Sequence, residues 1–441
     1  MRDIAVTAVV FAFLPLALRR PYVGIYLWAW LGFMNPHRLC WGFAYDFPFA
    51  YLVAAVTLIG MFFFREPKKI PWTRETVLLL VFILWMLLTT FFALHPEFAW
   101  PQLEKVIKIQ LMIFATLMLI TTKERLNILV WVVTLSVAFY GIKGGIFTVT
   151  HGGSFNVKGP GGTFFGENNA MGLALVMTIP LLRYLQLTAQ KKWQHIALTA
   201  AMVLCAIATI GSQSRGALLG ASAMALFLWL KSRNKFFTGL VIAVSAALVL
   251  SVMPAQWHQR MSTIQTYEQD QSAMGRINAW QMAFGLAKDR LLGGGFETFQ
   301  ADAFAAYAPD PDDVHDAHSI YFEVLGEHGF VGLALFLLLG LATWRSASWV
   351  IKTTKRDPDR KWAADLAAMV QVSMVGYAVG GAFLGLAYFD LYYNLIVFVV
   401  LSKLILSREQ LQPQPVPAAE NGKVGGWRRK QEVETGYSEV P

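Results

Sequence analysis

Charged residues are scarce in this sequence. Only 15% of its 441 residues are Asp, Glu, Lys or Arg, whereas about 25% is usual in soluble proteins. Such a low content argues against an ordinary soluble domain. Hydrophobic residues make up 56% instead, with 32 Phe and 15 Trp, and apolar runs of membrane-spanning length recur along the chain. The composition therefore predicts an all-α polytopic integral membrane protein.

Cysteine and the common cofactor motifs are also scarce or missing. The two cysteines, Cys40 and Cys205, lie in a predicted loop and inside an apolar run, so a disulfide framework is not expected. Zinc-type cysteine spacing, a phosphate loop and a dinucleotide fingerprint are all missing from the sequence. We therefore do not expect this chain to use ATP. The first apolar stretch lacks a small-x-small cleavage site, so a cleavable signal peptide is not expected either.

The net charge of +9 does not indicate a nucleic-acid partner, because of where the charges lie. Basic residues concentrate in short loops between apolar runs, which is the positive-inside pattern of membrane proteins. These loops include residues 65–74, 191–192, 231–235 and 352–361. Membrane lipids are thus the expected surroundings, with these loops in the cytoplasm.

The apolar runs predict a topology of about twelve transmembrane helices. Spans are expected near residues 49–64, 76–94, 106–121, 126–148, 170–187, 195–211, 215–230, 236–253, 319–344, 365–386 and 390–406. Residues 1–34 hold two apolar stretches, each short for a span and separated by "RRP". One broken crossing there gives twelve spans with both termini inside, and two crossings give thirteen with the N-terminus outside. We expect twelve.

The chain is expected to divide into four parts. Residues 1–253 form a bundle of about nine spans, 254–318 a small helical periplasmic cap between the ninth and tenth spans, 319–408 three further spans, and 409–441 a disordered cytoplasmic tail rich in Pro, Gly and polar residues. The cap segment has nine acidic and four basic residues, unlike the basic loops. Its stretch "SAMGRINAWQMAFGLAKDR" predicts a helix with one apolar face, formed by Ile277, Trp280, Phe284 and Ala287.

His318 stands at a boundary between the acidic segment and an apolar helix. Residues 319–344 predict one helix of about 39 Å, two turns longer than a hydrocarbon core of about 30 Å. Its first turns would protrude outside, because basic residues follow its other end. The positive end of the helix dipole disfavours an imidazolium, so His318 is expected to stay neutral and able to accept a proton. A simple cap of the helix is the alternative for this residue taken alone.

The acidic stretch before His318 also permits a metal site with His315, Asp316 and His318 as ligands. The ligand types fit, but no standard spacing matches. A solvated acidic loop at a helix N-terminus is the simpler interpretation, and it is the one we favour.

Two arginines are candidates for binding a phosphate or pyrophosphate. Arg215 opens a helix after the short turn "SQS", where free backbone N–H groups and a guanidinium would lie together. Ser212 and Ser214 are candidate caps of that helix. Arg276 lies in the same way at the start of the helix predicted in the cap. A contact with lipid phosphates is an equal alternative for Arg215, and a solvated surface charge is the alternative for Arg276.

A glycine-rich segment, "HGGSFNVKGPGGTFFGENNAMG" at residues 151–172, predicts an external loop with unusual backbone freedom. Asn168 or Asn169 is expected to cap the helix that follows. The loop could shape a substrate groove, with Lys158 available to an anion. A turn-rich connector is the alternative for each single residue.

These features, taken in order, resemble the O-antigen ligase family within the larger O-antigen ligase and polymerase superfamily. That family carries a histidine, a small polar residue, nine residues and then Gly-x-x-Gly, which here are His318, Ser319, 320–328, Gly329 and Gly332. "SQSRGALLG" resembles the family segment with an arginine at Arg215, and "GRINAW" followed by "RLLGGGFETF" resembles the segment with one at Arg276. "GTFFGENNA" is similar to the Gly-x-Phe…Asn-Asn segment that precedes a membrane span in the family. The N-terminal half, "RRPYVGIYLWAWLGFMNPHRL", resembles a branch of O-glycosylation ligases.

The resemblance implies a glycosyltransferase of the Gram-negative inner membrane with its site facing the periplasm. A glycan on undecaprenyl pyrophosphate would be transferred, with inversion and without metal, to a hydroxyl of a lipid A-core acceptor. His318 would be the general base, while Arg215 and Arg276 would bind the diphosphate. Glu323 and His328 are further candidates as helpers in the same segment.

Three alternatives remain from the sequence. An O-antigen polymerase or a protein O-oligosaccharyltransferase would use the same donor with another acceptor. A transporter of the lipid-linked glycan would show polar residues at mid-membrane and an internal repeat, of which there is little. A scaffold protein of envelope assembly would need no base beside anion donors.

Overall fold

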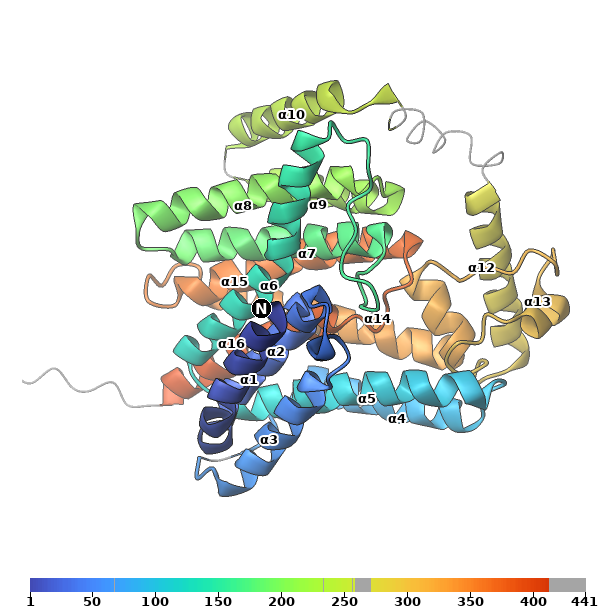
Figure 1. Ribbon diagram of the computed structural model, residues 1–441, viewed down its shortest axis with the longest axis horizontal. Helices are drawn as coiled ribbons and strands as arrows, with labels where there is room; N and C mark the ends of the chain where they lie inside the picture. Colours follow the sequence, from blue (N-terminus) through green and yellow to red (C-terminus); the bar gives the residue numbers. More distant parts are fainter. Residues whose placement is uncertain (67, 233, 256, 258–270, 412–441) are drawn as a thin grey trace, which may run out of the picture.

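The computed structural model describes residues 1–66, 68–232, 234–255, 257 and 271–411, and this part of the chain is helical (Figure 1). Its α-helices are α1 (Arg2–Arg19), α2 (Pro21–Met34), α3 (Phe49–Phe63), α4 (Arg74–Phe91), α5 (Pro96–Leu119), α6 (Lys123–Thr150), α7 (Asn168–Thr188), α8 (Lys192–Gly211), α9 (Arg215–Lys231), α10 (Lys235–Val252), α12 (Gln271–Asp289), α13 (Ala301–Tyr307), α14 (Ile320–Thr354), α15 (Lys361–Gly380) and α16 (Asp390–Leu411). Short 3₁₀ helices are η1 (Pro36–Leu39), η2 (Phe43–Tyr45) and η4 (Gly381–Phe383). The predicted tail beyond residue 411 lies outside the described residues.

A polytopic membrane protein is the class that these helices fit. Seven helices in the described part are long and apolar enough to cross a bilayer, namely α4, α6, α7, α8, α14, α15 with η4, and α16. Each expected span after residue 48 coincides with a helix, although several helices are longer than predicted. α5, for example, begins at Pro96, so residues 96–105 are helical and not a loop. The full count of twelve spans stays a prediction.

The first 34 residues form a helical hairpin. α1 and α2 contact each other and both contact α3, and the chain reverses at Arg20 between them. The start of α1 lies beside the segment that follows α2, because Arg2 donates to the Leu39 carbonyl (3.2 Å) and the Asp3 carboxylate accepts from the Gly42 N–H (3.0 Å). This reversal differs from the continuous path of a single broken crossing, and the number of crossings made by these residues stays a prediction. Proline at the first position of α2 starts a new helix, and this one folds back along the first.

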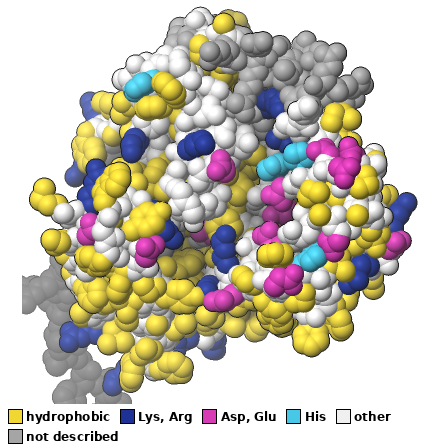
Figure 2. All heavy atoms as spheres, turned by 45° about the vertical axis from the view of Figure 1, so that its right-hand side comes forward, with side chains coloured by type: hydrophobic (Ala, Val, Ile, Leu, Met, Phe, Trp, Pro, Cys, Tyr) yellow, Lys and Arg dark blue, Asp and Glu magenta, His cyan; other side chains and the backbone are white. Residues whose placement is uncertain are grey.

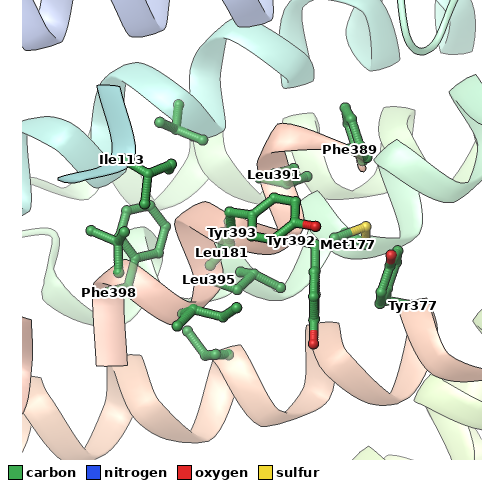
Figure 3. Packing of buried hydrophobic residues seen from close by; sticks show 14 of the residues in the cluster. Ile113, Met177, Leu181, Tyr377, Phe389, Leu391, Tyr392, Tyr393, Leu395 and Phe398 are labelled. Carbon is green, nitrogen blue, oxygen red and sulfur yellow. The ribbon is translucent and has the colours of Figure 1, made fainter. Parts of the chain in front are cut away.

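α16 lies at the centre of the bundle. α5, α6, α14 and α15 contact it, and most of its residues are buried. Figure 3 shows its aromatic and aliphatic side chains packed with residues from neighbouring helices. Tyr392 of α16 stacks on Tyr377 of α15 with ring centroids 4.6 Å apart. A helix that is apolar all round is expected to be buried in this way.

Residues 271–318 form a small unit at one end of the bundle, where α12 and α13 lie (Figure 1). The two helices share an apolar cluster, and α12 packs against α14. The apolar face predicted for α12 is shifted, because Phe284 is exposed while Asn278 is buried. Asn278 is buried because its amide binds the backbone of Asp310 (2.7 Å) and Asp313 (2.9 Å). The side of the membrane on which this unit lies stays a prediction.

Candidate functional site

The face of the molecule that carries α12 and α13 is hollowed (Figure 2). Acidic side chains and histidines gather on one side of the hollow, and basic side chains lie inside it and across it. The segment from residue 310 to the start of α14 carries exposed acidic side chains at Asp310, Asp312 and Asp316.

His318 is the penultimate residue before α14. It is half-buried and has a left-handed backbone conformation (φ 41°), which non-glycine residues rarely adopt. Ser319 occupies the N-cap position, but its buried hydroxyl has no hydrogen-bond partner among the described residues. The expectation that His318 lies at the helix N-terminus is confirmed. Strained backbone and an unpaired buried hydroxyl together are typical of functional sites.

Trp280 of α12 holds the segment before α14 in place. Its indole N–H donates to the Ala317 carbonyl (2.7 Å), and its ring stacks on Phe322 at 4.9 Å with an interplanar angle of 5°. Arg276 lies four residues earlier, on the same side of α12. This helix therefore positions an arginine and the segment of His318 together.

The electrostatic surroundings of His318 keep its imidazole neutral. Burial lowers the pKa of His318, the positive charges of Arg276 and His315 lower it further, and Asp316 partly opposes them. The neutrality expected from the helix dipole thus arises mainly from desolvation. Arg276 is half-buried and near enough to His318 for this interaction, so the structure brings these two candidate residues together.

Close packing of α12 against the acidic segment depends on Gly275. A Cβ at this position would lie 2.3 Å from the imidazole of His315. His315 in turn binds the Asp313 carboxylate (2.8 Å). No three of the His, Cys, Asp and Glu side chains in the described ranges converge as metal ligands would. His315 is thus part of the packing between α12 and the segment that leads to His318.

Arg215 is the first residue of α9 and is half-buried. The Ser214 hydroxyl accepts a hydrogen bond from the Ala217 N–H (3.2 Å), which confirms this serine as the helix cap. α9 packs through Gly216 against the end of α15, and η4, which follows α15, packs against Ile320 at the start of α14. The starts of α9 and α14 therefore meet at one segment, although no direct contact between Arg215 and His318 is observed.

The glycine-rich loop is tied to the turn before Arg215. Asn168 does not cap α7; Glu167 occupies the N-cap position, and the buried Asn168 amide donates to the Ser212 carbonyl (2.8 Å). Tertiary contact has taken precedence over the local capping preference here. Asn169 is half-buried in the first turn of α7, and the exposed Lys158 forms an ion pair with Glu167 at 3.9 Å.

The Gly-x-x-Gly motif breaks α14. Gly329 has φ 66° and ψ −172°, so the single helix predicted over residues 319–344 is divided there. The carbonyl groups of residues 326–328 accept hydrogen bonds from the Gly294 N–H (2.9 Å), the Gly295 N–H (2.8 Å) and the Trp85 indole (2.9 Å), respectively. A break inside a membrane helix leaves carbonyl groups without partners, and here a glycine loop and an indole supply them.

Both motif positions require glycine for steric reasons. A Cβ on Gly329 would lie 2.3 Å from the Leu291 carbonyl oxygen, and one on Gly332 would lie 2.3 Å from the His328 Cβ. The motif thus determines the backbone path of α14 after His318, and its two glycines contribute no side chains to a substrate groove. Ser319, which the motif also includes, lies next to His318.

Sequence reasoning missed a second group of charged residues. Lys105 of α5 interacts electrostatically with Glu297, Glu323 and Asp390, and its ammonium lies 3.9 Å from the ring centroid of Phe164 in the glycine-rich loop. These residues come from four separate segments, so no spacing in the sequence could reveal them. Glu323 was expected only as a helper, and its carboxylate accepts a hydrogen bond from the Ala387 N–H (3.0 Å).

His328, the other expected helper, is part of the core. Its side chain is fully buried, and its Nδ1 lies 2.7 Å from the Thr89 hydroxyl of α4. The neighbouring Glu327 accepts hydrogen bonds from Tyr388 and from the Glu297 N–H (2.8 Å). These contacts give His328 a structural environment, away from the solvent-accessible hollow.

An apolar groove of about 230 Å³ includes Ile320, the first residue of α14, in its lining. It runs between α14 and α15 from Ile320 and Tyr321 to Leu341 and Trp344. The groove could take a hydrocarbon chain whose polar end lies at the start of α14.

Two family matches divide the chain between them. Residues 1–189 match a family of unknown function, DUF5935, and residues 200–337 match the family described as O-Antigen ligase. No curated protein sequence matches the chain. The second match includes Arg215, Arg276 and His318. Arg215 and His318 lie at helix starts, whereas Arg276, which was predicted to open its helix, lies inside α12. Over residues 200–337 the chain is therefore similar to the O-antigen ligase family.

Proposed function

We propose that this protein transfers a glycan from undecaprenyl pyrophosphate to a hydroxyl of a lipid A-core acceptor at the periplasmic face of the inner membrane. The observation that carries the proposal is the hydrogen bond from the Trp280 indole to the Ala317 carbonyl (2.7 Å). It joins α12, which carries Arg276, to the residue before His318, inside the segment that matches O-antigen ligases. A neutral imidazole beside a guanidinium supplies a proton acceptor and an anion-binding group at one place.

His318 would act as the general base. Its imidazole accepts the proton of the acceptor hydroxyl, and the hydroxyl oxygen attacks the anomeric carbon of the donor glycan. The bond from that carbon to the pyrophosphate oxygen breaks on the opposite face, so the configuration inverts. The lowered pKa of His318 supports this role, because it favours the unprotonated imidazole that a general base requires.

Arg276 and Arg215 would bind the pyrophosphate. Negative charge develops on the pyrophosphate as the glycosidic bond breaks, and fixed guanidinium groups stabilise that charge without reorganising. Both arginines are half-buried, which strengthens their electrostatic effect relative to solvated side chains. The buried N–H groups at the start of α9 add to the site at Arg215.

The apolar groove between α14 and α15 is evidence for a donor that is linked to a lipid. It is lined mostly by apolar side chains and begins at Ile320, two residues after His318. A polyprenyl chain in this groove would leave its pyrophosphate near the starts of α14 and α12. The position of the groove, and not its volume, is what favours a membrane-bound donor over a soluble one.

Transfer by the purified full chain in detergent tests the proposal. The assay contains undecaprenyl-pyrophosphate-linked glycan, lipid A-core and EDTA, with wild type beside His318→Ala, Arg276→Ala and Arg215→Ala. We expect transfer by wild type in EDTA and a loss of at least a hundredfold in His318→Ala, the size usual for general base catalysis. His195→Ala, in an exposed histidine of α8 remote from these residues in sequence, serves as the control.

Three results would change the conclusion. Full activity in His318→Ala would refute this residue as the base. Products longer than one donor glycan, or glycosylated protein in place of lipid A-core, would indicate a polymerase or a protein O-oligosaccharyltransferase. Movement of the donor across vesicle membranes without transfer would indicate a transporter.

A further inference from the structure

Three adjoining cavities follow one side of α6, in the part of the chain that matches the family of unknown function. Their volumes are about 540, 510 and 280 Å³, within or near the range usual for ligand sites. The first two share Val9, Trp30, Met34 and Phe139, and the last two share Leu39 and Lys143. We call the three together the α6 groove.

The α6 groove changes from apolar to basic along its length. Its inner cavity lies between the α1–α2 hairpin and residues 128–139 of α6 and is lined almost wholly by apolar side chains. The next two cavities add Arg2, Lys143 and Lys158. From Lys143 to Trp131 the groove follows α6 for about 18 Å, slightly more than half of a hydrocarbon core of about 30 Å. These dimensions match one leaflet with its headgroup at the basic end.

Among the three basic residues, Lys143 gives the strongest indication of a bound anionic ligand. Its side chain is exposed, and it forms no hydrogen bond or ion pair with any residue that the structure describes. It lies near the end of α6 that the predicted topology places outside, where lysine is disfavoured by the positive-inside pattern. An exposed ammonium at this depth can bind a lipid phosphate, the anion that a bilayer surface supplies.

The charges beside Lys143 leave the basic end positive. Arg2 donates to the Leu39 carbonyl (3.2 Å), a neutral partner that leaves its charge uncompensated. The Asp3 carboxylate accepts from the N–H groups of Gly42 (3.0 Å) and Ala44 (3.3 Å) and keeps its negative charge, but it does not line the cavities. Lys158 has a distant partner in the exposed Glu167, at 3.9 Å, and such exposed pairs are weak.

We propose that the α6 groove binds the acyl chains and phosphate groups of the phosphorylated glycolipid that accepts the glycan. This inference rests on the proposed function and assigns acceptor binding to the segment of unknown function. The acyl chains would occupy the apolar cavities, and the phosphates would contact Lys143, Arg2 and Lys158. The donor lipid has a separate groove between α14 and α15, so each lipid substrate has its own groove.

Two observations favour this glycolipid over an ordinary phospholipid. The basic residues come from α1, α6 and the glycine-rich loop and extend over two cavities, which suits a headgroup with more than one phosphate. The outer cavity is formed partly by residues 156–160 of that loop. The same loop reaches the turn before Arg215 through the Asn168–Ser212 contact (2.8 Å). Sugars attached to the headgroup would thus extend along the loop towards the site.

Binding by the purified full chain in detergent tests the groove directly. Native mass spectrometry would measure the binding of diphosphorylated lipid A, phosphatidylglycerol and phosphatidylcholine to wild type, Lys143→Glu and Leu135→Trp. Leu135 lines the apolar cavity and is 42% exposed, so a larger ring there narrows the groove without disturbing the core. Lys288→Glu on α12 and Val203→Trp on α8 are matched controls, since both residues are exposed and line none of these cavities.

We expect wild type to prefer lipid A and each groove variant to bind it about tenfold more weakly, the loss of one charge-assisted contact or of similar apolar contact. The KM for lipid A-core should rise by a similar factor, while the KM for the donor stays constant. Equal binding of phosphatidylglycerol and lipid A would overturn the acceptor as the occupant. Unchanged lipid A binding in both variants would overturn the groove. Lipid A binding that depends on the groove, without any transfer, would support the site and refute the ligase function.

Discussion

Gly329→Ala probes how the break in α14 supports the site. Gly329 has φ 66° and ψ −172°, a region of backbone conformation that is almost restricted to glycine. The added methyl group would lie 2.3 Å from the Leu291 carbonyl oxygen. Either the loop at residues 291–295 moves away from α14, or α14 straightens at residue 329. Both responses separate the backbone of that loop from the carbonyl groups of residues 326 and 327.

The expected loss of stability can be estimated from these contacts. Forcing a non-glycine residue into this conformation costs about 1–3 kcal/mol. Two backbone hydrogen bonds, from Gly294 and Gly295 to the α14 carbonyls, contribute about 0.5–1.5 kcal/mol each. The free energy of unfolding should therefore fall by about 2–6 kcal/mol. Glycosyl transfer should fall by at least tenfold, because the first turns of α14 position His318.

Denaturant unfolding in detergent, followed by tryptophan fluorescence, measures the first quantity, and the transfer assay measures the second. Gly161→Ala is the matched control, since a Cβ at Gly161 would have no atom within 4 Å. It should change the unfolding free energy by less than about 0.5 kcal/mol, as surface substitutions do. Gly329→Ala with the stability and activity of wild type would refute the role assigned to the break.

Three further predictions concern the contacts around the site. Arg276→Gln removes a charge that lowers the pKa of His318, so the acidic limb of the pH profile of kcat/KM should move to higher pH; a limb at the wild-type pH would show that Arg276 does not act on His318. Trp280→Ala removes the bond to the Ala317 carbonyl and the stack on Phe322, so transfer should fall about tenfold with donor binding retained in a filter-binding assay. Asn168→Ala leaves the buried Ser212 carbonyl without this donor and should lower the unfolding free energy by about 1–3 kcal/mol, measured by the same denaturant titration.

The positions of the helices could be predicted from apolar runs and basic loops, because a bilayer imposes length and composition on each span. The start of α9 was also predictable, since Ser214 and Arg215 follow a short polar turn and act locally. The break at Gly329 was not. The segment around it is apolar and periodic, and what divides the helix is a loop from residues 291–295 that is more than thirty residues earlier in the sequence.

The charged group around Lys105 was unpredictable for a similar reason. Its members lie on α5, α14, α16 and the segment before α13, and only the packing of these elements brings them together. The hairpin of α1 and α2 depends on hydrogen bonds that Arg2 donates to residue 39 and that Asp3 accepts from residues 42 and 44. Short apolar stretches do not specify whether the chain continues or reverses, and these polar contacts between distant residues decide it.

The candidate site draws on both matched segments of the chain. His318 and the two arginines belong to the O-antigen ligase match, but the backbone below them depends on α4 of the other segment. Trp85 donates to the His328 carbonyl (2.9 Å), Thr89 lies 2.7 Å from the His328 ring, and the Leu94 N–H donates to the Gly294 carbonyl (2.8 Å). These contacts hold both the break in α14 and the loop that fills it. The segment of unknown function is therefore a structural part of the site, and changes in α4 should affect glycosyl transfer as directly as changes in α12.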